Sequence, residues 1–112
     1  MTSLADVLIE ARDLIADPDN WCRFHAARNA DGHPIADPTD PTAVRWCAAG
    51  ALSRAVAATN VAFADAFDLL KLCCVGTGIG PPSPQSTNDI CGHTAVLDMY
   101  DRAIRLAKDT ET

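Results

Sequence analysis

The sequence predicts an all-α protein, a small four-helix bundle with an irregular Asp-, Pro- and Gly-rich insertion between its first two helices. Three observations predict this fold. Four stretches of the chain place apolar residues three and four positions apart, which is the spacing of one face of a helix. Turn-forming residues crowd the single segment 18–40. The 112 residues suffice for one domain, so we expect residues 1–112 to form a single helical domain.

Residues 3–16 are the first expected helix. Ser3 is suited to cap its start, with Asp6 three residues later as a capping-box partner. The helix ends before Pro18, because the residue that precedes a proline avoids the α conformation. Its apolar stripe is formed by Leu4, Val7, Leu8, Ala11, Leu14 and Ile15.

The insertion carries one strong turn signal. Asp31 and Gly32 are adjacent, and an Asp-Gly pair is typical of the two-residue turn of a short β-hairpin. We therefore expect residues 28–30 and 33–35 to pair as a ribbon. The apolar and aromatic run 21–25 would anchor the insertion on the bundle, since an irregular backbone cannot stabilise itself.

The second helix is expected to open at Asp40 and Pro41, because Asp is a preferred N-cap and Pro fits the first helical position. It ends near Asn60. Gly50 lies in its interior, where a glycine costs about 1 kcal/mol relative to alanine. We therefore expect Gly50 to let a neighbouring backbone or ring approach closely. Cys47 falls inside the same helix.

The third and fourth helices are expected over residues 61–75 and 88–108. Both show the apolar spacing of a helix that packs on a core. Ser86 or Thr87 would cap the fourth helix, and a loop rich in glycine and proline, residues 76–84, separates the two.

The charge of the chain excludes one class of function. Lys and Arg number 9 and Asp and Glu 15, which gives a net charge of −6. A general nucleic-acid binder needs a basic face that displaces counterions from phosphates, so we expect no general nucleic-acid binding. The sequence has no apolar run long enough to span a membrane and no basic leader, so we expect a cytoplasmic protein that contacts no membrane. In that reducing compartment its five cysteines would be free.

Residues 88–93 are the most pointed candidate for chemistry. Asp89 and His93 lie four positions apart, so on a continuous helix the carboxylate could orient the imidazole. A thiol from another helix, with Cys47 the best candidate, would complete a Cys-His-Asp catalytic arrangement. The alternative is structural, because Asp89 suits the first turn of a helix and His93 falls within an apolar stripe.

Two Cys-His pairs raise the question of a metal. Cys22 with His25 and Cys91 with His93 would offer two thiolates and two imidazoles, a set that zinc accepts. The second pair is spaced more tightly than the ligands of zinc fingers, and the chain has no C-x-x-C pair. We therefore predict no metal site, and no feature of the sequence indicates a cofactor.

Aromatic and basic residues gather around two Trp-Cys pairs. If Arg28 and Arg45 converge near a tryptophan face, they could hold an anion or a nucleotide base. The alternative is that the two indole rings pin the insertion against the second helix. The candidate ligand-binding residues are Trp21, Arg28, Arg45, Trp46, Asn88 and His93.

Three motifs carry a resemblance to a known family. They are Trp21-Cys22 with the run 27–32, then Asp40-Pro41-x-Ala43-Val44-Arg45-Trp46-Cys47-x-x-Gly50-Ala51-Leu52, and finally Asn88-Asp89-x-x-Gly92-His93. Over roughly residues 20–106 the chain resembles a family of small bacterial and phage proteins that is known only as a domain of unknown function. The resemblance therefore implies membership of a family and no activity or mechanism.

These observations favour a small helical module that binds a protein or a small ligand, as a regulator, inhibitor or decoy does, with a homodimer left open. The alternative is a small thiol hydrolase or transferase that uses Cys47, His93 and Asp89. We favour the non-enzymatic module, because Cys47 falls inside a helix, whereas a nucleophilic thiol gains most at a helix N-terminus.

Overall fold

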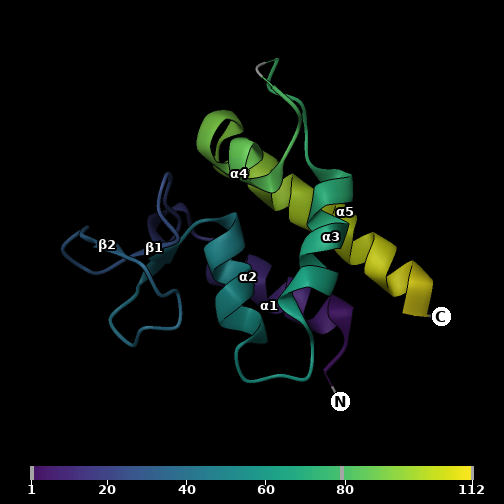
Figure 1. Cartoon of the computed structure of the whole chain (residues 1–112), viewed down its shortest axis with the longest axis horizontal. Coiled ribbons are helices and arrows are strands. Elements are labelled where there is room, and N and C mark those ends of the chain that lie inside the picture. The colour runs from purple at the N-terminus through teal and green to yellow at the C-terminus, as the bar shows by residue number, and fades with distance from the viewer. Residues whose placement is uncertain (1, 79, 112) are drawn as a thin grey trace.

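The computed structural model describes residues 2–78 and 80–111. Within them the chain forms five α-helices and a small three-stranded antiparallel sheet. The fold is therefore a mixture of α and β, and the prediction of an all-α four-helix bundle is wrong. Figure 1 shows the helices gathered on one side, with the sheet projecting at the end of the molecule away from the C-terminus.

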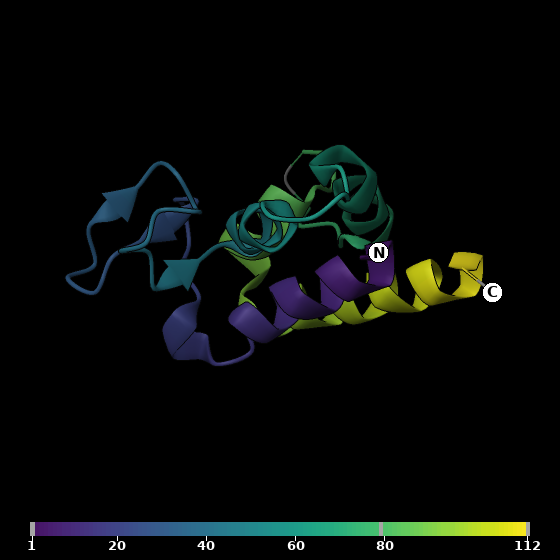
Figure 2. The same cartoon turned by 90° about the horizontal axis from the view of Figure 1, so that it is seen from below.

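Two antiparallel helices form one layer of the helical part. α1 (Leu4–Leu14) and α5 (His93–Glu111) run alongside each other in opposite directions (Figure 2). The predicted capping box of α1 is confirmed, because Ser3 and Asp6 exchange their hydrogen bonds. The predicted stripe also faces the core, where Val7, Leu8, Ala11 and Ile15 are fully buried. No helix in the described part of the chain is both long and apolar enough to cross a membrane.

The second layer consists of α2 (Ala48–Val56) and α3 (Phe63–Cys73), which pack on α1 and α5. α2 begins seven residues later than Pro41, so the predicted start of the second helix is wrong. Asp40 accepts hydrogen bonds from the backbone N–H and the hydroxyl of Thr42, at 2.8 and 2.7 Å, which makes a local turn in place of a helix cap. The N-cap of α2 is Cys47.

The sheet contains β1 (Ala27–Arg28), β2 (Pro34–Ile35) and β3 (Arg45–Trp46), in the order β2-β1-β3. β1 and β2 pair on either side of Asp31 and Gly32, so the predicted hairpin is confirmed, although its strands are shorter than predicted and residues 29–33 form a longer connection than a two-residue turn. β3 occupies residues that we expected in the second helix, and it pairs antiparallel with β1. The insertion is thus tied to the main body by the strand that leads into α2.

Gly50 allows α2 to lie directly against the insertion. A Cβ atom at this position would stand 1.9 Å from the carbonyl oxygen of Ala26. The expectation that Gly50 permits the close approach of another backbone is therefore confirmed. The same carbonyl accepts the Cys47 N–H at 3.2 Å, so the contact also fixes the start of α2.

The last helix is interrupted, which corrects the prediction of a continuous helix over residues 88–108. Ser83, rather than Ser86 or Thr87, caps a short helix α4 (Pro84–Ser86), and a π-helical turn η2 (Thr87–Cys91) follows it. Gly92 then adopts a φ of 99°, which side chains rarely allow, and α5 begins at His93. A 3₁₀ turn, η1 (Pro18–Asn20), links α1 to the insertion.

Candidate functional site

The insertion and β3 border an open surface hollow of about 550 Å³, which we call the arginine hollow. One side comes from the segment that follows η1, another from the tip of the β1–β2 hairpin, and the third from β3. Its lining residues are Trp21, Cys22, Arg23, Phe24, Arg28, Ala30, Asp31, Gly32 and Arg45.

Backbone carbonyls and an indole hold the three guanidinium groups of the hollow. Arg28 donates to the carbonyl of Gly32 at 2.8 Å. Arg45 donates to the carbonyls of Asp19 and Asn29, at 3.0 and 3.2 Å. The guanidinium carbon of Arg23 lies 4.9 Å from the centre of the Trp21 ring, a cation–π contact.

Within residues 2–78 and 80–111, none of these three arginines forms an ion pair with an acidic side chain. In the described residues the ion pairs are Arg12 with Asp101 and Lys71 with Asp68, both away from the hollow. The nearby thiol of Cys22 supplies no negative charge at neutral pH, because its pKa is raised to about 11, first by burial and then by the neighbouring Cys47. Asp31 is the one carboxylate among the lining residues. The hollow is therefore locally positive in a negatively charged chain.

A buried amide fixes the aromatic wall of the hollow. Asn88, in η2, is 1% exposed, and its side-chain oxygen accepts from the Trp21 indole N–H at 2.7 Å and from the Ala48 N–H at 2.9 Å. Its side-chain nitrogen donates to the carbonyl of Cys22 at 3.1 Å and to the carboxylate of Asp89 at 2.9 Å. All of its hydrogen-bonding capacity is used inside the protein.

The structure brings three of the six candidate ligand-binding residues into the hollow: Trp21, Arg28 and Arg45. The other three lie behind it. Trp46 is buried and donates its indole N–H to the carbonyl of Pro38 at 2.9 Å, Asn88 is enclosed, and the ring of His93 lies 5.4 Å from that of Trp21.

Two lining residues that matter for its chemistry, Arg23 and Phe24, are absent from the six candidate ligand-binding residues. Arg23 and Phe24 belong to the apolar and aromatic run that we expected to anchor the insertion. Phe24 instead is 66% exposed and has a φ of 71°, in the left-handed region that a bulky side chain rarely adopts. The alternation of Trp, Arg and Phe between two turns was the available signal, but it does not distinguish an anchor from an exposed wall.

The three candidate catalytic residues have separate partners. His93 places its Nε2 2.6 Å from the carbonyl oxygen of Ile15, so this nitrogen carries a hydrogen and donates. Asp89 accepts from the backbone N–H of Phe24 at 2.9 Å and from the amide of Gln85 at 3.1 Å. Because Gly92 separates η2 from α5, the four-residue spacing of Asp89 and His93 does not fall on one continuous helix. Their catalytic role remains a prediction.

Cys47 lies at a helix N-terminus rather than inside a helix, which corrects the sequence-based placement. Its sulfur accepts from the N–H of Gly50 at 3.2 Å. The residue is 3% exposed, and burial raises the pKa of its thiol, more than the hydrogen bonds from Gly50 and Ala49 lower it. The helix N-terminus therefore does not convert this thiol into a thiolate at neutral pH.

The cysteines and histidines considered for zinc have different surroundings. Cys22 is buried and donates to the carbonyl of His25 at 3.4 Å, whereas Cys91 is exposed on η2. In the part of the chain that the structure describes, no three His, Cys, Asp or Glu side chains form a group that could hold a metal ion.

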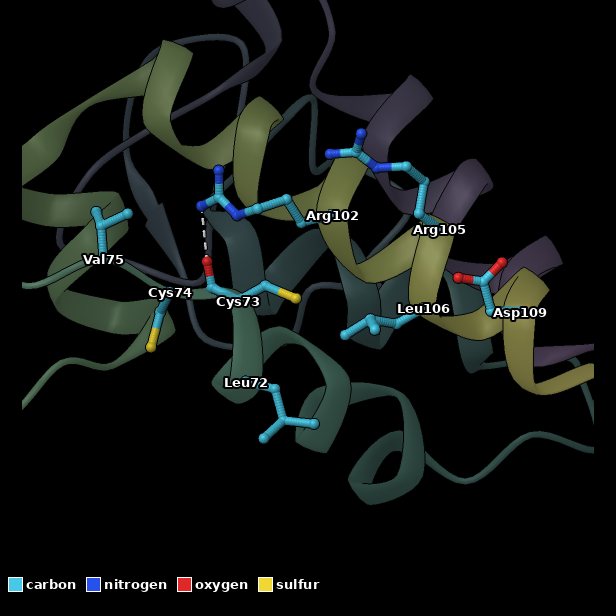
Figure 3. A pocket seen from close by; sticks show the side chains of 8 residues that line it. All are labelled: Leu72, Cys73, Cys74, Val75, Arg102, Arg105, Leu106 and Asp109. Atoms are coloured by element: carbon cyan, nitrogen blue, oxygen red, sulfur yellow. Dashed lines mark hydrogen bonds between the residues drawn. The ribbon is translucent and has the colours of Figure 1, made fainter.

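A second hollow, of about 530 Å³, lies between the end of α3 and the second half of α5. Figure 3 shows the guanidinium of Arg102 reaching from α5 to the carbonyl of Cys73, at 2.7 Å. A cation at the last carbonyls of a helix is favourable, so this contact stabilises the end of α3. Sequence reasoning did not predict this hollow, which is lined by Leu72, Cys73, Cys74, Val75, Arg102, Arg105, Leu106 and Asp109.

Comparison with known protein families gives a match over most of the chain. Residues 1–106 match the model of DUF6197, a family of unknown function. Among curated proteins and among solved structures, none matches the chain. The resemblance that the Trp-Cys and Asn-Asp motifs indicated therefore agrees with a family model that covers nearly the whole chain. With this coverage, the chain belongs to the DUF6197 family of unknown function.

Proposed function

We propose that this protein is a binding module whose arginine hollow holds an anionic group of a small ligand. One observation carries the proposal: Arg23, Arg28 and Arg45 line a single hollow, and in the described residues none of them pairs with a carboxylate. Like charges gathered without a counterion repel each other, and a bound anion would relieve that repulsion.

The contacts of the arginines support an anion site rather than a purely structural cluster. Each guanidinium group has five N–H donors, and those of Arg28 and Arg45 use two each on backbone carbonyls. Donors therefore remain for a ligand, while the carbonyl contacts keep the groups in place. A planar fork of donors matches the oxygens of a carboxylate or a phosphate, and such charge-assisted hydrogen bonds are the strong ones.

The size of the hollow supports a small ligand. Its volume of about 550 Å³ falls within the range of small-molecule sites, roughly 300–1,000 Å³. The net charge of −6 disfavours a long polyanion, which the rest of the surface would repel. An anionic small molecule is compatible with both the positive hollow and the negative net charge of the chain.

The test uses inorganic phosphate as the probe and the two indole N–H resonances as reporters. Trp21 lines the hollow and Trp46 is buried behind it, so phosphate should shift the Trp21 resonance and leave that of Trp46 in place. The variants Arg28→Gln and Arg45→Gln should each weaken binding about tenfold, because each removes charged hydrogen bonds. Arg45→Lys should weaken it less, since it keeps the charge.

Arg54→Gln is the matched control. Arg54 also donates to backbone carbonyls, of Pro38 and Asp40, and lies over an indole, that of Trp46, but outside the hollow. It should bind phosphate as the wild type does. The proposal fails if phosphate leaves the Trp21 resonance unmoved at low ionic strength, or if Arg54→Gln weakens binding as much as the two variants in the hollow.

A further inference from the structure

Phe24 is the one lining residue of the arginine hollow, glycine aside, whose backbone adopts a strained conformation. Its φ of 71° is in the left-handed region, and its ring is 66% exposed although the residue lines the hollow. Strained residues persist only where their surroundings fix them, and they concentrate at functional sites. Packing in the core therefore does not account for the strained backbone of this exposed aromatic residue.

The strain is maintained by the π-helical turn. The carboxylate of Asp89 accepts the Phe24 N–H at 2.9 Å, and Asn88 donates to the same carboxylate oxygen at 2.9 Å. Asn88 in turn holds the indole of Trp21. Asn88 and Asp89 of η2 thus contact both aromatic residues of the hollow, Trp21 through its indole and Phe24 through its backbone N–H.

We infer that the anion in this hollow is a phosphate carried by a compound with a planar aromatic ring, as in a nucleoside monophosphate, and that the ring stacks on Phe24. This inference rests on the proposed function and names its ligand class. Arg23 covers one face of Trp21, which leaves the exposed ring of Phe24 for a ligand. Aromatic rings bind nucleobases by stacking and accept any base, because every base has a π-face.

Charge complementarity favours a phosphate over a single carboxylate. The lining residues carry three guanidinium groups and the carboxylate of Asp31, and the carboxylate of Asp89 accepts the Phe24 N–H beside them. The hollow therefore keeps an excess of one to two positive charges. A phosphomonoester carries about −1.5 to −2 at pH 7, whereas a carboxylate carries one negative charge. A free nucleotide also fits the negative chain better than a nucleic-acid strand, which needs a basic face along its length.

The experiment compares ligands that differ only in the base. The four nucleoside 5′-monophosphates are titrated against ribose 5-phosphate, which keeps the sugar and the phosphate. At least one nucleotide should bind about tenfold more tightly than ribose 5-phosphate, the order of effect expected for one stacked base. A single-stranded oligonucleotide serves as the third arm, and per nucleotide it should bind no more tightly than the free nucleotide.

Two variants separate stacking from a structural role of Phe24. Phe24→Gly removes the ring and also the strain, because glycine adopts a positive φ freely, and the relief offsets the greater freedom of glycine in the unfolded chain, so the variant should fold with a stability near that of the wild type. It should lose the preference for nucleotides over ribose 5-phosphate, because the stacking partner of the base is gone. Phe24→Tyr keeps a ring and should keep the preference.

The outcomes distinguish this inference from the proposed function. If ribose 5-phosphate binds as tightly as all four nucleotides, the aromatic part of the ligand is overturned and anion binding stands. If none of these phosphates binds, both are overturned. If the oligonucleotide binds more tightly per nucleotide than the free nucleotide does, the ligand is a nucleic-acid strand, and the inference is overturned.

Discussion

Asn88 shows at the scale of one residue how an irregular segment can present a rigid site. Its amide joins three parts of the chain, because it bonds Trp21 and Cys22 in the insertion and Ala48 at the start of α2. A buried amide with every donor and acceptor used fixes a single arrangement, since any other one would leave polar atoms unpaired. The sequence pointed to Asn88 as a ligand-binding residue, but its contacts serve the walls of the hollow.

At the scale of single residues, burial also determines how fast each thiol reacts. Burial raises the pKa of Cys47, and only the thiolate reacts as a nucleophile, so we expect slow alkylation of Cys47 at pH 7. Cys91 is exposed and should be modified first. Mass spectrometry after timed exposure to iodoacetamide measures each cysteine separately, and urea should make Cys47 react as fast as Cys91. Fast alkylation of folded Cys47 that His93→Ala abolishes would contradict this prediction and favour the thiol enzyme.

At the scale of elements, local sequence patterns predicted the helices and turns that depend on contacts between residues close in the sequence. The capping box and the apolar stripe predicted α1, and the Asp-Gly pair predicted the β1–β2 hairpin. β3 depends on pairing with β1, seventeen or more residues earlier, which no local pattern reports. Asp40 and Pro41 fit a helix start, but Thr42 competes for the Asp40 side chain and makes a turn.

The candidate site was predictable in part for the same reason. Arg28 and Arg45 are charged residues beside tryptophans, and the structure places both in the hollow. The sequence pattern did not distinguish Phe24 from a core residue, because an aromatic side chain in a short apolar run is usually buried. Gly92 also hid the break between η2 and α5, since the apolar spacing continues across it.

The contact of α2 with the insertion gives an element-scale prediction at Gly50. Replacing a glycine inside a helix by alanine usually stabilises it, by about 1 kcal/mol. Gly50→Ala should instead lower the free energy of unfolding by at least about 2 kcal/mol, because the new Cβ would meet the Ala26 carbonyl oxygen and force two backbones apart. Urea unfolding measures the change.

Gly76→Ala is the control for this substitution. A Cβ at Gly76 would meet nothing closer than the Pro82 side chain at 3.9 Å, an ordinary contact. Its free energy of unfolding should stay near that of the wild type or rise slightly, because alanine restricts the unfolded chain. Equal effects of the two substitutions would show that α2 and the insertion are not in close contact.

At the scale of the whole molecule, buried thiols and a buried phenol make stability depend on alkaline pH. Burial raises the pKa of Cys22 to about 11 and also raises the pKa of Cys47, Cys73 and Tyr100. Below about pH 8 each thiol is protonated in the folded and the unfolded chain alike, because the ordinary pKa of a thiol is 9.0. Above pH 9 the unfolded chain loses these protons while the folded chain keeps them, so unfolding becomes easier as the pH rises.

The free energy of unfolding should therefore be constant from pH 7 to about pH 8 and fall between pH 9 and 11, with Cys22 contributing up to about 1.4 kcal/mol per pH unit. Urea unfolding with a reductant present, repeated across this range, measures the slope. Cys22→Ala should reduce the slope, because it removes the proton that the folded chain retains up to about pH 11. A slope that this variant leaves unchanged would mean that Cys22 reaches solvent in the folded chain and is not buried beneath the arginine hollow's other lining residues.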